Sequence, residues 1–277
     1  MVEATANIAG QIQQIIVTRV KIPIMFTQAI VRTPCKAIVR GLSTANLGAP
    51  HYQNALDQHA DYVDALKECG LRVTILPADE SFPDSTFVED TALMTPRCAI
   101  LTRPGAPSRA KEVLSMHATL REFSETVEMI EAPGTIEAGD IMMVGDHYFI
   151  GLSERTNQAG ADQMITILEK YGMHGSMVEL TDVLHLKTGL GYLENDYLLA
   201  SGEFIDRPEF KRFKLLGVDP DEAYAANSVW INGTVLTPSG FPKTRALIES
   251  AGYRVRPVDV SEFRKLDGGL SCLSLRF

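Results

Sequence analysis

The chain has 277 residues, of which 45% are hydrophobic and 22% charged, and its formal net charge is −9. This composition is typical of a globular protein that folds without disulfides, and it argues against a nucleic-acid partner, because phosphate binding needs a basic face. The negative charge favours a cationic ligand, although solubility accounts for it equally well.

The N-terminal segment shows no export or membrane signal. It lacks a basic stretch followed by an apolar one, so we expect no signal peptide. No apolar run approaches the roughly 20 residues that span a bilayer, which predicts a cytoplasmic protein without a membrane partner. Residues 1–24 include QIIVTRV and are expected to form an extra strand or a disordered extension. Residues 25–277 are expected to form a single domain.

The first predicted elements after the extension are a strand, a helix and a second strand. The strand lies within residues 25–34. Residues 50–70 carry Leu56, His59, Val63 and Leu66 at three- and four-residue spacing, which predicts a helix. Gly70 is a typical helix stop, and LRVTILP predicts the strand that follows.

Four later stretches share one pattern: a small or polar start, an apolar strand, a short turn and a second apolar strand, which predicts hairpins. They cover residues 89–105, 138–156, 187–204 and 225–242. Their starting positions, residues 90, 140, 188 and 227, are 50, 48 and 39 apart, which indicates a repeat architecture.

Helical segments follow three of these hairpins, at 109–123, 157–172 and 243–252, and each leads into another strand. After Phe204 the helix is reduced to a short segment within 207–218, which explains the shorter spacing. The predicted unit is therefore ββαβ. The C-terminal GGLSCLSLRF supplies a fifth first strand, whose partner is the N-terminal strand. Pairing of the two ends would close five units into a five-bladed α/β propeller and remove the sheet edges.

Equivalent positions of a closed repeat converge near its axis, so the polar residues at the starts of the first strands are candidates for a site. They are Asp84, Glu89, Asp90, Glu137, Asp140, His185, Asn227 and the segment from Asp267 to Cys272. Any one of these carboxylates has an alternative role as a cap, and His185 as a half-buried strand residue. Together, a thiol, a histidine and several acids form a catalytic set more readily than a core.

The other three cysteines, Cys35, Cys69 and Cys98, are interpreted as structural thiols. The cysteines and histidines show no metal-ligand spacing, and reduced thiols fit a cytoplasmic location. We therefore expect no metal and no organic cofactor. The two glycines before Cys272 are expected to let a substrate approach the backbone.

Several motifs resemble those of the dimethylarginine dimethylaminohydrolases, which belong to the guanidine-modifying superfamily that includes arginine deiminase. These motifs are FPDSTFVEDTAL, APGTIEAGDIMMVGDHYFIG, VLHLKTG and KLDGGLSCLSLRF, and the resemblance covers residues from about 25 to 277. It implies the five-bladed propeller (pentein) fold. It also implies hydrolysis of Nω-methylated arginines to citrulline and a methylamine through a covalent cysteine intermediate.

The resemblance also assigns roles. Cys272 matches the nucleophile and His185 the general acid and base, while Glu137 and Asp90 match the carboxylates that hold the guanidinium. The remaining matches concern substrate binding: Asp84 and Glu89 in the pocket motif, with Asp84 for the α-ammonium, Arg109 and Arg155 for the substrate carboxylate, Leu42 in the lid loop, and Leu266 as a backbone contact.

Two rival functions stay open on the sequence alone. An arginine deiminase would share the catalytic residues and differ only in the pocket around the methyl groups. A non-catalytic propeller would be a binding protein, but it would have no reason to align Cys272, His185 and Glu137. The expected partner is a small methylated arginine, and a homodimer is left open.

Overall fold

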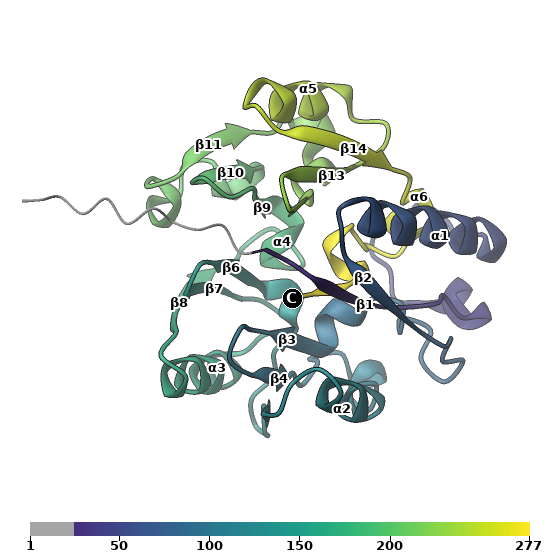
Figure 1. Cartoon of the computed structure of the whole chain (residues 1–277), viewed down its shortest axis with the longest axis vertical. Helices are drawn as coiled ribbons and strands as arrows, with labels where there is room; N and C mark the ends of the chain where they lie inside the picture. The colour runs from purple at the N-terminus through teal and green to yellow at the C-terminus, as the bar shows by residue number, and fades with distance from the viewer. Residues whose placement is uncertain (1–24) are drawn as a thin grey trace, which may run out of the picture.

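The computed structural model describes residues 25–277, and Figure 1 shows helices at the periphery and the C-terminus near the centre. The predicted strand or disorder of residues 1–24 lies outside the described residues. Within the described part, no helix is long and apolar enough to cross a membrane.

The described chain forms five three-stranded sheets in a mixed α/β arrangement. In each sheet the middle strand pairs antiparallel with one neighbour and parallel with the other. The sheets are β15 (Leu275–Arg276), β1 (Gln28–Arg32) and β2 (Arg72–Leu76); β3 (Ala92–Met94), β4 (Ala99–Leu101) and β5 (Val127–Met129); β6 (Ile141–Val144), β7 (His147–Leu152) and β8 (His174–Glu179); β9 (Leu190–Tyr192), β10 (Tyr197–Ala200) and β11 (Lys214–Gly217); and β12 (Val229–Ile231), β13 (Thr234–Pro238) and β14 (Arg254–Val258).

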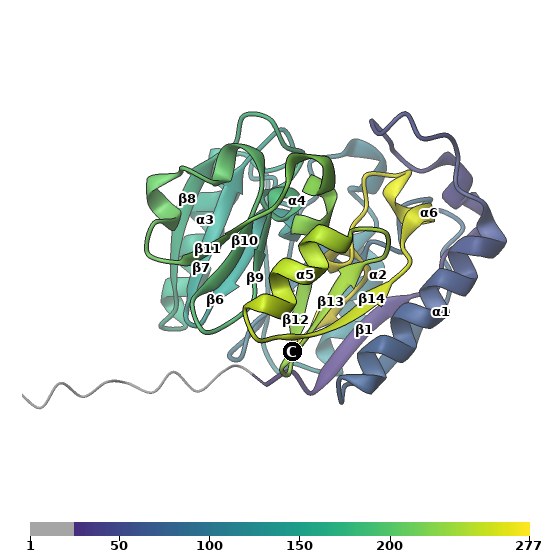
Figure 2. The same ribbon diagram turned by 90° about the horizontal axis from the view of Figure 1, so that it is seen from above.

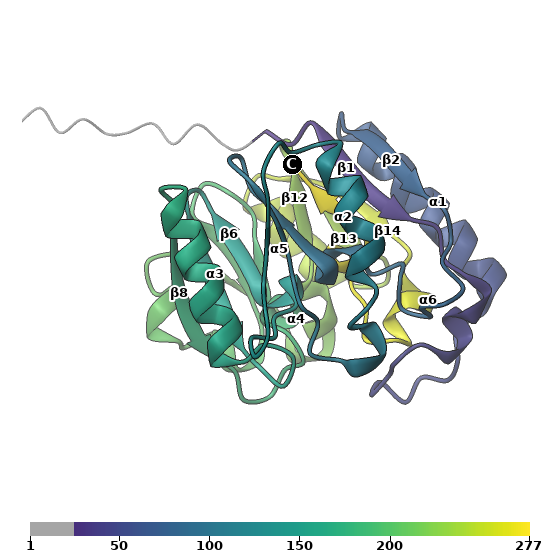
Figure 3. The same cartoon turned by 90° about the horizontal axis from the view of Figure 1, so that it is seen from below.

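Helices connect the parallel strands in four of the sheets, as such crossovers require. They are α1 (Tyr52–Glu68), α2 (Val113–Arg121), α3 (Gln158–Lys170) and α5 (Pro242–Ser250). Figures 2 and 3 show them on the outside of the molecule. In the fourth sheet the connection is reduced to the 3-10 turns η5 (Gly202–Phe204) and η6 (Pro208–Phe210); only η6 lies in the predicted short helical segment 207–218, of which residues 214–217 form β11 instead. Helix α2 begins later than expected, because Pro107 first starts a separate 3-10 turn, η3 (Pro107–Arg109).

The two ends of the described chain lie in one sheet, as predicted. Strand β15 pairs antiparallel with β1, with Ala29 opposite Arg276 and Ile30 opposite Leu275. The amides of Thr27 and Gln28 both donate to the Phe277 carbonyl at 2.8 Å. This pairing places the residues just before β15 at a defined position between the other sheets.

In every sheet, the strand that pairs antiparallel with the middle strand is called the inner strand. A short helix precedes each of these inner strands. These helices are η2 (Val88–Thr91), η4 (Ala138–Asp140), α4 (Leu186–Gly189), η7 (Pro220–Ala226) and η8 (Ser271–Leu273). The inner strands lie against one another, β3 against β15, β6 against β9 and β9 against β12. The predicted site residues at the starts of these strands are therefore carried by equivalent helical turns that face the middle of the molecule.

Two further short helices, η1 (Lys36–Arg40) and α6 (Ser261–Arg264), flank helix α1. The short turn predicted in the last hairpin is confirmed, and it consists of Asn232 and Gly233, with φ values of 50° and 92°. The Asn232 side chain accepts from the Phe26 amide at 2.9 Å and donates to the carbonyls of Phe26 (2.8 Å) and Cys69 (3.0 Å). This turn holds the beginning of the described chain against the end of α1.

Helix α1 packs its buried face onto the first sheet and the C-terminal strand. Tyr62 is fully buried, and its hydroxyl lies 2.7 Å from the hydroxyl of Ser274. His59, on the same face, is 5% exposed, and its Nε2 has no hydrogen-bond partner among the described residues. Burial lowers the pKa of His59 to about 4, because the charged imidazolium would lose its hydration there.

We expect His59 to make the fold acid-sensitive. The unfolded chain takes up a proton near pH 6.5 and the folded chain only near pH 4, so stability falls as the pH drops between these values. The full effect is about 3 kcal/mol, because one pKa unit corresponds to about 1.4 kcal/mol. Urea unfolding of His59→Leu against the wild type at pH 7, 5.5 and 4 should show a stability difference that shifts in favour of the variant towards acid. A pH-independent difference, equal to that of His174→Leu at an exposed position, would contradict this expectation.

Candidate active site

Nine of the ten predicted site residues line one cavity of about 60 Å³. They are Leu42, Asp84, Asp90, Arg109, Glu137, Arg155, His185, Leu266 and Cys272. A smaller cavity of about 30 Å³ also contains His185 and Cys272, together with Asp267. Residues that are far apart in the sequence and belong to different repeats therefore converge, as the sequence predicted.

His185 and Glu137 form a buried pair at the centre of the site. His185 Nε2 lies 2.8 Å from Glu137 Oε2, and the exposed fractions of the two residues are 9% and 1%. His185 precedes helix α4, while Glu137 precedes η4. The backbone amide of Glu137 donates to the Thr156 hydroxyl at 3.2 Å. The second carboxylate oxygen of Glu137, Oε1, accepts from the Ala106 amide at 3.3 Å.

The electrostatics of this pair favour an imidazolium beside a carboxylate. Burial opposes both charges, but the charge of Asp140, the hydrogen bond to Glu137 and the charge of Asp90 outweigh it and raise the pKa of His185. In the same way the hydrogen bond and charge of His185, with Arg109 and Arg155, hold the pKa of Glu137 below its usual range despite burial. His185 can therefore act as an acid at neutral pH.

Asp140 fixes the backbone next to His185. It is fully buried, and its carboxylate accepts hydrogen bonds from the hydroxyls of Ser153 (2.7 Å) and Thr156 (2.6 Å) and from the Leu186 amide (2.9 Å). The last of these bonds holds the residue after His185, so Asp140 orients the imidazole as well as raising its pKa.

Arg109 is more committed to protein partners than the sequence suggested. Its guanidinium binds Glu112 at two points, 2.9 and 2.8 Å, and lies 2.5 Å from Asp90 Oδ2. It also donates to the carbonyl of Phe87 at 3.0 Å. Since most of its donors are occupied, Arg109 chiefly positions Asp90, whose other oxygen accepts from the Gly139 amide at 3.2 Å.

Arg155 is the freer of the two predicted arginines. Its side chain is 22% exposed, and its nearest carboxylate oxygen, on Glu137, is 3.9 Å away. Asp84, on the wall of the same cavity, accepts a hydrogen bond from the Leu42 amide at 3.0 Å, and burial raises its pKa. Arg155 and Asp84 therefore offer an anion-binding and a cation-binding group in one cavity.

The loop that begins at Leu42 covers the cavity and is fastened to the segment before Cys272. Leu42 itself is 40% exposed, and Leu266 is buried. The Thr44 hydroxyl donates to Asp267 at 3.1 Å, and the Thr44 amide donates to the same oxygen. Leu42 thus lines the cavity, and Thr44 holds its loop to the C-terminal segment.

Cys272 lies on η8, and its sulfur accepts from the Gly269 amide at 3.4 Å. Burial, together with the charges of Glu89 and Asp90, raises the pKa of Cys272 to about 12, so its side chain is a thiol at neutral pH. The preceding glycines have a packing role that the sequence did not suggest. A Cβ on Gly268 would lie 2.2 Å from Phe87, and one on Gly269 would lie 2.5 Å from Asn227.

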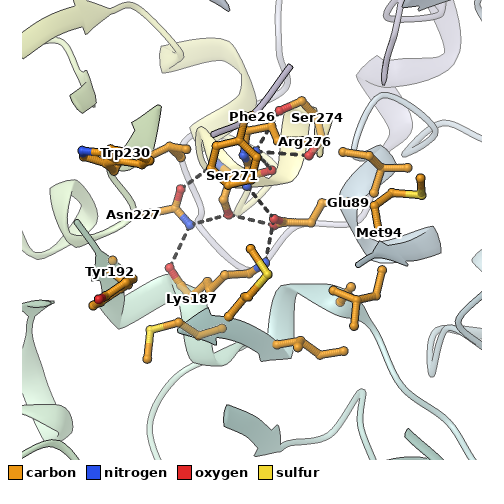
Figure 4. A pocket seen from close by; sticks show the side chains of 18 of the residues that line it. Phe26, Glu89, Met94, Lys187, Tyr192, Asn227, Trp230, Ser271, Ser274 and Arg276 are labelled. Carbon is orange, nitrogen blue, oxygen red and sulfur yellow. Dashed lines mark hydrogen bonds and ion pairs between the residues drawn. The ribbon is translucent and has the colours of Figure 1, made fainter. Parts of the chain in front are cut away.

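One predicted site residue, Glu89, lies elsewhere. It lines a separate cavity of about 130 Å³ on the other side of η8, where it contacts Lys187, Ser271 and Arg276 (Figure 4). Glu89 and Asp90 are adjacent in η2, and their side chains serve two different cavities.

Asp90, Glu137 and His185 each place one possible metal-ligand atom within 4.8 Å of the other two. Among the described residues, no other group of three acidic, histidine or cysteine side chains lies close enough together to hold a cation. Arg109 already forms an ion pair with Asp90, and His185 forms one with Glu137. Planar nitrogen donors thus bind one oxygen of each carboxylate, and planar N–H donors are also what a guanidinium presents to a carboxylate.

Sequence reasoning missed Glu112 and Lys187. Glu112 follows Arg109 by three residues, a spacing that permits an ion pair on one helical turn. Lys187 follows His185 by two residues within the motif VLHLKTG. The positions of Glu112 and Lys187 close to predicted site residues could have drawn attention to them. The partner of Lys187 could not be inferred in this way, because the carboxylate that faces it comes from another repeat.

Comparison with known proteins shows the family of the chain. The sequence profile of the eukaryotic N,N dimethylarginine dimethylhydrolases matches residues 44–197. An N(G),N(G)-dimethylarginine dimethylaminohydrolase from Pseudomonas aeruginosa is 56% identical over 254 residues, 91% of this chain and 100% of that protein. One from Streptomyces coelicolor is 34% identical over 253 residues, 90% of this chain and 96% of that protein. The chain belongs to the dimethylarginine dimethylaminohydrolase family.

Solved structures extend the comparison. A cysteine-to-serine mutant of the Pseudomonas aeruginosa enzyme complexed with citrulline matches with a TM-score of 0.91 and 56% identity, over 92% of this chain and 100% of that one. The N-terminal domain of ArgZ, covalently bound to a reaction intermediate, matches with a TM-score of 0.81 at 22% identity, over 90% of this chain and 97% of that one. This second likeness concerns the fold alone.

The His185–Glu137 pair generates a prediction. Replacing Glu137 by Gln removes the charge that stabilises the imidazolium, so the pKa of His185 should fall by about one unit or more. NMR titration of the His185 ring in the two proteins measures this shift. Glu128→Gln, which removes a surface partner of Lys170, is the matched control and should leave the His185 midpoint in place. An unchanged midpoint in Glu137→Gln would show that the pair does not set the protonation state.

Proposed function

We propose that this protein hydrolyses Nω-methylated arginines, asymmetric dimethylarginine and monomethylarginine, to citrulline and dimethylamine or methylamine. The observation that carries the proposal is the convergence of Cys272, His185 and Glu137 on one cavity with Asp90. A thiol, an acidic imidazolium and two carboxylates are what attack on a bound guanidinium requires. The family membership established above supports the same reaction.

The carboxylates act first, by binding. A guanidinium is planar and cationic, and Asp90 and Glu137 offer acceptor oxygens for its N–H groups. Binding fixes its plane so that the Cys272 sulfur can approach the central carbon from one face. The substrate's positive charge also favours the thiolate, because an opposite charge nearby lowers a thiol pKa. Substrate binding therefore activates the nucleophile, and the thiol proton passes to solvent, because His185 is already protonated.

The chemistry then follows in two halves. The Cys272 thiolate forms a bond to the guanidinium carbon, and the bond from that carbon to the methylated nitrogen breaks as the His185 imidazolium gives that nitrogen a proton. An S-alkylthiouronium intermediate remains. The neutral His185 next takes a proton from water, whose oxygen attacks the same carbon. The carbon–sulfur bond breaks with its electron pair going to sulfur, and the hydroxyl proton of the adduct passes to that sulfur, so that citrulline and the Cys272 thiol separate.

The amino-acid end of the substrate is assigned to the other wall of the cavity. Arg155 binds the α-carboxylate and Asp84 the α-ammonium, while Leu42 and Leu266 lie beside them. The partial exposure of Arg155 and its long distance from Glu137 support this role, because the guanidinium still has free donors. Arg109, whose donors are largely occupied, contributes mainly by fixing Asp90.

We also propose that the five sheets are blades of one closed propeller and that residues 25–277 form a single catalytic domain. The pairing of β1 with β15 supports closure. The large cavity supports it too, since residues of all five inner strands line it. A cytoplasmic location and a homodimer remain predictions.

The decisive assay measures citrulline release from asymmetric dimethylarginine, with arginine as the parallel substrate. We expect turnover of the methylated substrate and its loss in Cys272→Ser. Cys98→Ser is the matched control, because Cys98 is buried in a hydrophobic cluster away from the site. Turnover of arginine instead would assign the protein to the deiminases. Turnover of neither substrate by the folded protein would refute the enzyme assignment.

A second prediction concerns Arg155. Arg155→Ala should raise KM for dimethylarginine roughly tenfold or more and change kcat little, because the contact is made equally in the ground and transition states. The same variant should leave KM unchanged for a dimethylated alkylguanidine that lacks the carboxylate. Arg245→Ala, at an exposed position on α5, is the control. An equal loss of kcat for both substrates would place Arg155 in the chemistry instead.

A further inference from the structure

A thin layer of side chains separates the candidate active site from the larger cavity. Lys187, Asn227 and Ser271 line both that cavity and the small one that contains Cys272. Figure 4 shows that Glu89 contacts Lys187, Ser271 and also Arg276, while Asn227 contacts Lys187 and Ser271. These five residues are called the partition.

Glu89 is the only carboxylate in the partition, and it faces two cations. Its Oε1 lies 2.6 Å from Lys187 Nζ and 3.2 Å from Arg276 Nη2, while Oε2 accepts from the Ser271 hydroxyl at 2.8 Å. Glu89 is only 4% exposed. Because solvent screens buried charges poorly, the charges of Glu89, Lys187 and Arg276 affect the pKa of any titratable group beside them.

The partition is fastened directly to the nucleophile. The Ser271 amide donates to Asn227 Oδ1 at 2.9 Å, and Asn227 Nδ2 donates to the Lys187 carbonyl at 2.8 Å and to the Ser271 hydroxyl at 3.0 Å. Ser271 immediately precedes Cys272, whose sulfur lies 4.0 Å from the Ser271 hydroxyl. The charges of Glu89 and Lys187 therefore have fixed positions relative to the sulfur.

The two charges act on Cys272 in opposite directions. Glu89 disfavours the thiolate and Lys187 favours it, as for any charge near an ionising thiol. Without Glu89, Lys187 would present an uncompensated cation to the sulfur in the empty site. The other titratable groups that face Cys272 or line the same cavities are Asp84, Asp90, Arg109, Glu137, Arg155, His185, Tyr224 and Asp267.

We propose that Glu89 compensates the charge of Lys187 and thereby keeps Cys272 a thiol until a cationic substrate binds. Glu89 is thus a positioning residue that acts through Lys187, and not a substrate ligand. A permanent thiolate would be open to alkylation and oxidation whenever the site is empty. The role of the substrate rests on the proposed function, whereas the effect of Glu89 on the free protein does not.

The test follows the rate at which iodoacetamide alkylates Cys272 as a function of pH, without substrate. Cys272→Ser gives the background from the other cysteines. In Glu89→Gln the midpoint of the rate profile should move down by about one pH unit, which raises the rate near neutral pH roughly tenfold. In Lys187→Met the midpoint should move up. The double variant Glu89→Gln/Lys187→Met should return towards the wild type.

These opposite shifts distinguish the proposal from a structural role, since loosened packing would change the exposure of the thiol in the same direction in both variants. A midpoint in Glu89→Gln that is unchanged or higher overturns the proposal. If Glu89→Gln does not fold, as judged by circular dichroism, Lys187→Met decides: an upward shift supports compensation, and an unchanged or lower midpoint refutes it. The assay contains no substrate, so a failure of the proposed hydrolysis leaves its outcome interpretable.

Discussion

The pairing of the chain's two ends is the constraint on which the site depends. Strand β15 has only two residues, yet it is held by β1 on one side and contacts β3 on another. Leu275 is buried in one hydrophobic cluster with Ile30 and Val88. Without this pairing η8 would be the frayed end of the chain. With it, Cys272 is carried by a turn whose neighbours on both sides are fixed, which is the precision that a nucleophile needs.

The short helix before each inner strand also explains why so many charged side chains are buried around the site. Burying an ion costs several kcal/mol unless partners replace its hydration. Arg109 has Asp90 and Glu112, Lys187 and Arg276 share Glu89, and His185 has Glu137. The partners come mostly from different repeats, so the ion pairs also tie neighbouring sheets together. Catalytic geometry and fold are in this sense one set of contacts.

Sequence reasoning succeeded where periodicity and equivalence apply. The hairpins, the helices, the pairing of the ends and the convergence of Cys272, His185 and Glu137 all follow from repeated patterns of apolar and polar residues. It was less complete where a residue's role depends on a partner from another repeat. Nothing in the sequence shows that Glu89 turns to the far cavity while Asp90 faces the near one. The glycines before Cys272 are similar: packing against Phe87 and Asn227 requires them, and neither contact is local.

The charge arrangement alone treats arginine and its methylated forms alike, because methylation leaves the guanidinium charge unchanged. Methylation does remove N–H donors, and the dimethylated nitrogen has none. A carboxylate needs such donors, so Asp90 and Glu137 must hold the other two nitrogens. In the proposed mechanism the dimethylated nitrogen is left to a partner that donates once sulfur has added to the carbon, and the His185 imidazolium is that partner. The proton that makes this nitrogen a leaving group comes from the residue whose pKa the surrounding carboxylates raise. Binding orientation and the choice of the departing amine therefore have one physical cause.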